Sequence, residues 1–143
     1  MSIKLILILV ALVVLTTLCV GCAMFYGKKA GRHAVETATY EDLGVEDFQT
    51  YIANDNVQLL DVRAKDEFEE GHIARALLVD VNDSAFVENA MAVLDKQRPV
   101  AVYCRSGRRS ARAAILLAAQ GFMVTNLDGG VLAWQDAGKA LVK

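Results

Sequence analysis

VAVYCRSGRRSARAAILLAAQ, residues 100–120, is the stretch that decides the fold. Its first four residues, Val100–Tyr103, are apolar throughout, which predicts a buried central strand. Residues 109–120 are rich in alanine and predict a strong helix, which Gly121 ends. A short polar loop joins the two. A strand that leads almost directly into a helix is the unit from which α/β domains are built.

The segments on either side continue this alternation. Further helices are expected over residues 45–53, 65–70 and 84–94, the last capped by Ser84, and a short final helix is expected around Trp134. Further strands are expected over residues 57–62, 76–81 and 124–127. Apolar runs of strand length that alternate with helical patterns predict a parallel sheet covered by helices on both faces. The sequence therefore predicts a compact α/β domain.

Composition limits the size and the partners of this domain. The chain has 143 residues, enough for one domain of ordinary size, and its net charge of −2 argues against nucleic acid as a partner. Cys104 is the only cysteine in the globular part, so no disulfide is expected within it. With one histidine there, His72, and no paired cysteine, neither a metal site nor a cofactor is expected.

The first residues predict attachment to a membrane. Residues 5–27 carry no charge and are bracketed by Lys4 and Lys28, and a helix of this length crosses a hydrocarbon core about 30 Å thick. The alternative is a bacterial lipoprotein signal that ends at Cys22, preceded by the small Gly21, although Cys19 departs from that pattern. Basic residues flank both ends and leave the membrane side open, with the extracytoplasmic (periplasmic) side slightly favoured. The expected organisation is an anchor or signal over residues 1–28, a linker over 29–39 and the domain over 40–143.

The loop after Tyr103 carries the chemistry. Ligands of open α/β sheets bind beyond the carboxyl ends of the strands, where Cys104 is placed. The following turn aims backbone N–H groups inward, the helix adds its positive end, and Gly107 permits a conformation that would strain other residues. Arg105, Arg108 and Arg109 add positive potential. Such surroundings favour a thiolate over a thiol and bind an anion beside it, which suits thiosulfate, a persulfide or a phosphate ester.

Three motifs resemble those of rhodaneses. CRSGRR, residues 104–109, is similar to their active-site loop. Their early signature resembles LDVR (60–63), which is followed by Glu67-Phe68 and by GHI (71–73). Their C-terminal signature resembles LDGGV (127–131), which is followed by Ala133-Trp134. The resemblance covers residues 40–143 and implies a central five-stranded parallel sheet flanked by helices on both faces. It also implies a sulfurtransferase that moves sulfane sulfur from thiosulfate or a persulfide to a thiol or cyanide through a persulfide on Cys104, with a protein acceptor also open.

The resemblance gives each residue of the loop a role. It makes Cys104 the nucleophile and assigns substrate binding to Arg105, Ser106, Gly107, Arg108 and Arg109, with Arg105 and Arg109 at the family's anion-binding positions. Around the loop, Asp61 and Arg63 are expected to brace it, His72 to make a structural hydrogen bond, Trp134 to pack in the core, and Arg112 to point away.

Two other functions remain open. Cysteine phosphatases resemble a Cys-x5-Arg pattern, whereas Arg109 lies at Cys-x4-Arg, and the shorter loop suits a sulfur atom better than a phosphoryl group. The second alternative is a catalytically idle rhodanese-like module used for binding. Such modules usually lack the cysteine that this chain has.

Overall fold

The computed structural model describes residues 39–143. The anchor or signal expected over residues 1–28 lies outside the described residues, as does nearly all of the expected linker. Within the part that is described, no helix has the length and apolar character needed to cross a membrane.

The described residues form a five-stranded sheet in which every strand pairs in parallel. Its strands, in the spatial order β1-β5-β4-β2-β3, are β1 (Glu41–Leu43), β5 (Val124–Leu127), β4 (Val100–Tyr103), β2 (Gln58–Asp61) and β3 (Leu77–Leu78). Strand β4 lies at the centre of the sheet, with neighbours on both sides and helices on both faces, and all four of its residues are buried. Only an apolar strand tolerates this complete loss of contact with water. The expected α/β fold with a five-stranded parallel sheet is confirmed, whereas the hydrophobic helix expected before it lies outside the described residues.

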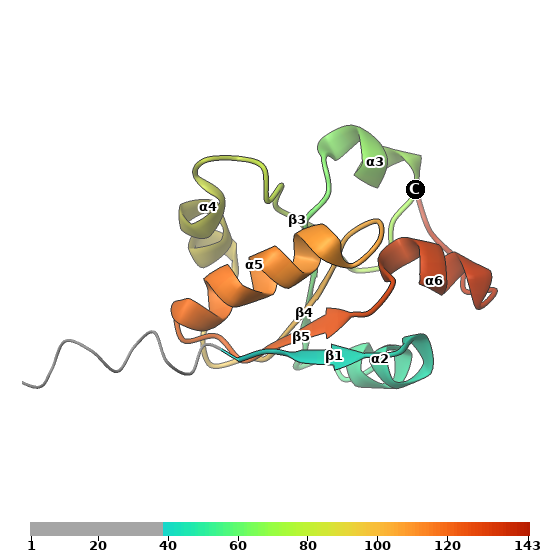
Figure 1. Cartoon of the computed structure of the whole chain (residues 1–143), viewed down its shortest axis with the longest axis horizontal. Coiled ribbons are helices and arrows are strands. Elements are labelled where there is room, and N and C mark those ends of the chain that lie inside the picture. The colour runs from blue at the N-terminus through green and yellow to red at the C-terminus, as the bar shows by residue number, and fades with distance from the viewer. Residues whose placement is uncertain (1–38) are drawn as a thin grey trace, which may run out of the picture. The chain divides into compact units, whose positions relative to one another are not determined.

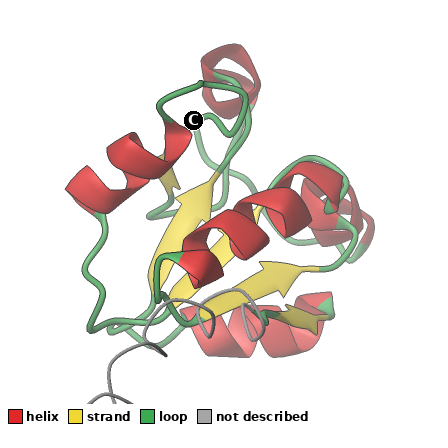
Figure 2. Cartoon of the chain, turned by 60° about the vertical axis from the view of Figure 1, so that its left-hand side comes forward, coloured by secondary structure: helices red, strands yellow, loops and turns green. Residues whose placement is uncertain are grey.

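Within residues 39–143, five helices connect and cover the strands: α2 (Val45–Ile52), α3 (Lys65–Glu70), α4 (Phe86–Val93), α5 (Arg108–Ala119) and α6 (Gly130–Asp136). The strands form a layer with helices on both sides (Figure 2). Short α3 has no buried residue and lies beyond the sheet, near the C terminus (Figure 1).

Two separate cores occupy the two faces of the sheet. Successive side chains of a strand point to opposite faces. Val100 and Val102 therefore pack in one core with α4 and α5, whereas Ala101 and Tyr103 pack in the other with α2 and α6. Cys104 belongs to the first of these cores. Since both cores hold β4, the strand end that carries Cys104 is fixed from both sides.

The largest differences from the expected elements concern β1, β3 and α4. Strand β1 was not expected, because two of its three residues are acidic, yet it forms an edge by pairing with β5. Strand β3 has only two residues, whereas a strand over residues 76–81 was expected. After β3, the backbone N–H groups of Val79 and Val81 donate to the carbonyls of Asp61 and Val62, outside the regular pairing of the two strands. Helix α4 begins at Phe86 after Ala85, so the expected capping role of Ser84 is wrong.

Candidate active site

Cys104 lies at the end of β4, in a loop that the neighbouring backbone holds tightly. Its side chain is fully buried. Gly107 adopts φ +88°, a conformation that disfavours side chains, and a Cβ there would lie 3.2 Å from the backbone nitrogen of Gly129. This positive φ turns the chain from the strand end into α5 and so makes the tight loop possible.

The N-terminus of α6 supports the loop from behind. The backbone N–H of Val131 donates to the Cys104 carbonyl at 2.8 Å, and that of Leu132 donates to the Arg105 carbonyl at 3.1 Å. Gly130 is pressed against the same backbone: a Cβ there would lie 2.5 Å from the Cys104 carbonyl oxygen. Because it lacks a side chain, Gly130 lets a helix end meet the loop at backbone distance.

Hydrogen bonds to the sulfur lower the pKa of the Cys104 thiol. Burial is the largest single influence and acts in the opposite direction, because it disfavours a thiolate. The Ser110 hydroxyl, whose Oγ lies 3.3 Å from Sγ, and the backbone N–H groups of Ser110, Ser106 and Gly107 together outweigh it. The net result favours the thiolate, which is the nucleophilic form.

The arginines lie differently from one another. Arg109 makes a two-pronged ion pair with Glu67 of α3, its two terminal nitrogens lying 2.6 and 2.7 Å from the carboxylate oxygens. The pair raises the pKa of Arg109 and lowers that of Glu67, chiefly through these hydrogen bonds. Arg105, Ser106 and Arg108 are exposed. Arg109 therefore offers less of its charge to a substrate than the sequence suggests.

Two hollows lie on either side of the loop. The first, here called the basic hollow, has a volume of about 390 Å³ and is lined by Ser106, Arg108, Arg109 and Arg112. The second, the mixed hollow, has a volume of about 330 Å³ and is lined by the loop residue Arg105, by α3, by α6 and by Leu141. Arg109 lines the first and Glu67 the second, so their ion pair stands between them.

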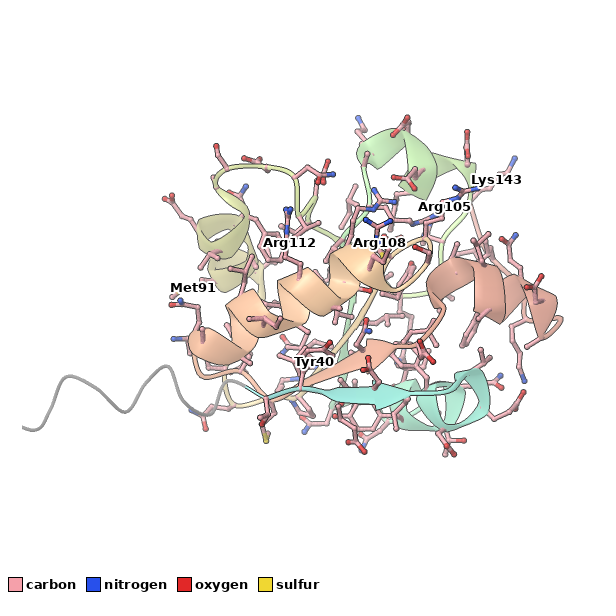
Figure 3. The ribbon with its side chains drawn as sticks, in the orientation of Figure 1. Tyr40, Met91, Arg105, Arg108, Arg112 and Lys143 are labelled. Carbon is pink, nitrogen blue, oxygen red and sulfur yellow. The ribbon has the colours of Figure 1, made fainter. Side chains whose placement is uncertain are left out.

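The expectation that Arg112 points away from the loop is wrong. Arg112 joins Arg108 and Arg109 around the basic hollow, and its guanidinium donates a 2.5 Å hydrogen bond to the Val81 carbonyl. In Figure 3, Arg112 lies on the α4 side of the site, whereas Arg105 lies on the side of the C-terminal residues. Residues four apart on a helix share a face, so Arg108 and Arg112 turn the same way.

The residues around the loop have structural contacts. Arg63 pairs with the buried Asp61 at 2.6 Å, donates to the Gly71 carbonyl at 2.8 Å and lies 5.7 Å above the Tyr103 ring. The pair therefore holds the chain after β2. Arg63 lines the mixed hollow together with the loop residue Arg105 but donates no hydrogen bond to the loop, so the bracing is less direct than expected. His72 Nδ1 lies 3.0 Å from the Phe68 carbonyl oxygen, and Trp134 is buried with its Nε1 donating to Ala140, as expected of structural residues.

Two residues of the site were not singled out from the sequence. Ser110 contacts the sulfur because the first turn of α5 returns beside the strand end, and its place six residues after Cys104 was the available signal. The second is Glu67, which the sequence shows only as part of the early signature, with no sign of its ion pair with Arg109. Its position near the start of α3 lets its carboxylate accept the Ala64 N–H at 3.3 Å as well as the Arg109 guanidinium.

Known proteins resemble this chain in sequence and in fold. The sequence matches the family described as the Rhodanese-like domain over residues 44–137. The chain belongs to this family. It is 35% identical over 102 residues to the thiosulfate sulfurtransferase GlpE of Shewanella oneidensis, covering 70% of this chain and 97% of that protein. It is 37% identical over 89 residues to a sulfurtransferase of Allochromatium vinosum, covering 62% of this chain and 80% of that one.

A solved structure agrees with the fold. The rhodanese-related protein of Thermoplasma volcanium superimposes with a TM-score of 0.64 at 27% identity, covering 72% of this chain and 98% of that one. The rhodanese fold expected from the three sequence motifs is thereby confirmed.

Proposed function

We propose that this protein is a sulfurtransferase in which Cys104 takes the sulfane sulfur of thiosulfate and passes it to a thiol or to cyanide. The observation that carries the proposal is a buried sulfur whose thiol pKa is lowered by a hydroxyl and backbone N–H groups, next to a hollow lined by three arginines. The sulfurtransferases that this rhodanese-like domain resembles support the reaction class.

The geometry suggests how the first step proceeds. The Cys104 thiolate attacks the sulfane sulfur of thiosulfate, a new S–S bond forms, and the bond to the sulfonate sulfur breaks as sulfite leaves with the electron pair. The charge of −3 on thiolate and thiosulfate together is kept by the persulfide and sulfite. The backbone N–H groups of Ser106 and Gly107 stabilise the anionic sulfur before and after the step.

Intact-mass measurement tests the covalent step. The full-length protein incubated with thiosulfate should gain one sulfur, roughly 32 Da, on the peptide that contains Cys104. Cys104→Ser retains Cys19 and Cys22 and is therefore the matched control, which should gain nothing. Thiocyanate should then form with cyanide. A persulfide that never turns over would indicate an idle module, and equal labelling of both proteins would overturn the role of Cys104.

The arginines of the basic hollow bind the donor in this proposal. Thiosulfate carries two negative charges, and a hydrogen bond to a charged group contributes about 1.5–3 kcal/mol. Arg108→Gln should therefore lower kcat/KM for thiosulfate by at least about tenfold. Arg98→Gln is the control, because its guanidinium donates to the Asp55 and Asn56 carbonyls near the opposite end of the sheet. Equal effects of the two changes would contradict donor binding in this hollow.

Membrane attachment through residues 1–28 is a second part of the proposal, and the uncharged run of residues 5–27 supports it. The full-length protein should sediment with membranes and resist extraction by salt. Cys22→Ala separates the two mechanisms, because it abolishes lipid labelling of a lipoprotein and leaves a spanning helix unaffected. Recovery of the unaltered chain in the soluble fraction would contradict both.

A further inference from the structure

The sulfur of Cys104 is closed off from the two hollows beside its loop. The Cys104 side chain is fully buried, and neither the basic hollow nor the mixed hollow has Cys104 in its lining. Thiosulfate that occupies either hollow therefore does not touch the sulfur that it has to meet. A group beside the loop has to move before the first covalent step.

The ion pair of Glu67 with Arg109 stands at the place that has to open. Arg109 lines the basic hollow and Glu67 lines the mixed hollow, so the pair forms the partition between them. Hydrogen bonding to Glu67 is the main reason for the raised pKa of Arg109, and the charge of Cys104 adds to it, which places the guanidinium near the sulfur. Parting the two side chains therefore opens the partition beside Cys104.

Helix α3, which carries Glu67, has few other ties. It has no buried residue and lies beyond the sheet (Figure 1). Within residues 39–143, its only hydrogen bonds to parts of the chain outside residues 64–72 are the two from Arg109. An element with so few buried contacts opens at a low cost in free energy. The ion pair is thus the contact that keeps α3 closed over the loop.

We propose that Glu67 is a gating residue: its ion pair with Arg109 closes the approach to Cys104, and the thiosulfate donor opens it by taking the Arg109 guanidinium from the carboxylate. The planar guanidinium fork that holds two carboxylate oxygens also fits two oxygens of the sulfonate group. No covalent bond changes in this exchange, because Arg109 trades one anion for another and Glu67 turns its charge to solvent. The proposal rests on the function proposed above and adds how donor binding uncovers the sulfur.

The exposure of the pair suits an exchange of partners. Both side chains are partly exposed, so the carboxylate that leaves Arg109 regains water. The pair of Arg63 with Asp61 is buried in contrast, and parting it leaves two charges without water or partner. Of these two pairs beside the loop, only the one that contains Glu67 can open and close during turnover.

Sulfur loading tests the gate by the sign of the effect. The full-length protein is mixed with thiosulfate, and sulfur addition is followed by the mass of the peptide that contains Cys104. Glu67→Gln should raise the rate constant by about 2- to 5-fold, the change that corresponds to about 0.5–1 kcal/mol from a partly exposed pair. Glu70→Gln is the matched control, because it removes the same charge from α3, and Glu70 forms no ion pair within the described residues.

The opposite sign identifies the alternative role. If Glu67 only holds Arg109 in position for the donor, Glu67→Gln slows loading, and this result would overturn the gate. Equal acceleration by Glu67→Gln and Glu70→Gln would overturn it as well, because the loss of any carboxylate on α3 then suffices. Absence of loading in the unaltered protein would contradict the proposed function instead, and the following measurement would still decide the gate.

Alkylation by the neutral reagent iodoacetamide separates a gate from charge repulsion. At a pH where the Cys104 thiol is fully ionised, the rate constant reaches a plateau that depends on access to the sulfur. Glu67→Gln should raise this plateau by about 2- to 5-fold, whereas Glu70→Gln should leave it unchanged. An unchanged plateau for Glu67→Gln would overturn the gate even where thiosulfate loading is faster, because weaker repulsion of the anion then explains the gain.

Discussion

The adjacent ends of β2 and β4 hold their charges in opposite ways. The two strands are parallel, with Asp61 paired to Tyr103 in register, so Arg63 and Cys104 follow at the same edge of the sheet. After β2, Asp61 and Arg63 are buried and satisfy each other with three side-chain hydrogen bonds. After β4, the sulfur is held by a hydroxyl and backbone N–H groups, with Arg105 and Arg108 exposed nearby.

The difference separates an end whose charges are paired from an end at which positive potential remains. Where cation and anion are paired inside the protein, little positive potential remains for a ligand. Where backbone dipoles converge on a sulfur and unpaired cations lie on the same loop, potential remains for both a thiolate and an anionic substrate. Arg109 lies between these extremes, because Glu67 pairs with it while about a quarter of each side chain stays exposed, 29% and 26%.

Breaking the β2 end should give the largest effect on stability. Asp61→Asn leaves the buried Arg63 charge without its carboxylate, and removing one partner of a buried pair costs about 3–5 kcal/mol. The measurement is urea unfolding. Asp55→Asn is the matched control, because Asp55 also pairs with an arginine, Arg75, but is 94% exposed, so a change of only about 0–1 kcal/mol is expected. Similar values for both would show that the β2 end is not the structural one.

The β4 end should respond in reactivity instead. Ser110→Ala removes the hydroxyl at the sulfur, so the pKa of the Cys104 thiol rises and alkylation by iodoacetamide near neutral pH should slow by about tenfold. The whole pH profile should move to higher pH. Ser106→Ala serves as the control, since Ser106 lowers the pKa through its backbone N–H, which alanine retains. An unshifted profile for Ser110→Ala would assign the thiolate's stability to the backbone alone.

The intermediate pair should give the smallest effect. A double-mutant cycle of Glu67→Gln and Arg109→Met, measured by urea unfolding at pH 7, should give a coupling of about 0.5–1 kcal/mol because both side chains are partly exposed. The folded pKa of Glu67 lies below its ordinary value of 4.5. The coupling should therefore be complete above about pH 4.5 and disappear as the pH falls through the lower, folded pKa. Coupling that persisted in stronger acid would contradict the ion pair.

The order of elements and the position of Cys104 at a strand end could be predicted because they depend on local pattern. Apolar Val100–Tyr103, followed by a glycine turn and an alanine-rich helix, has few other arrangements, and a strand end places Cys104 without knowledge of the remaining fold. Strand β1 could not be predicted in the same way. Its acidic residues resemble a solvated segment, and it becomes a strand only by pairing with β5. The two strands are far apart in the sequence: Asn126 and Asp42, which share a hydrogen bond, are separated by 84 positions.

The roles of the arginines could not be predicted because they depend on distant partners. Glu67 and Arg109 are 42 positions apart, and only the packing of α3 above the loop shows that they pair. Arg112 similarly turns towards the basic hollow because the Val81 carbonyl, 31 positions away, accepts its hydrogen bond. Spacing from Cys104 identifies which cations are near the sulfur and does not show which of them are neutralised.

The close approach of Gly130 to the loop has a consequence for the order in which the domain becomes reactive. During synthesis the chain emerges from its N-terminus, so Cys104 appears well before the Val131 and Leu132 N–H groups that hold its loop. Until α6 arrives, nothing fixes the Cys104 and Arg105 carbonyls, and the loop amides need not converge on the sulfur. We therefore expect a nascent or truncated chain to carry an ordinary, weakly acidic thiol, and the lowered pKa of Cys104 to require the finished domain.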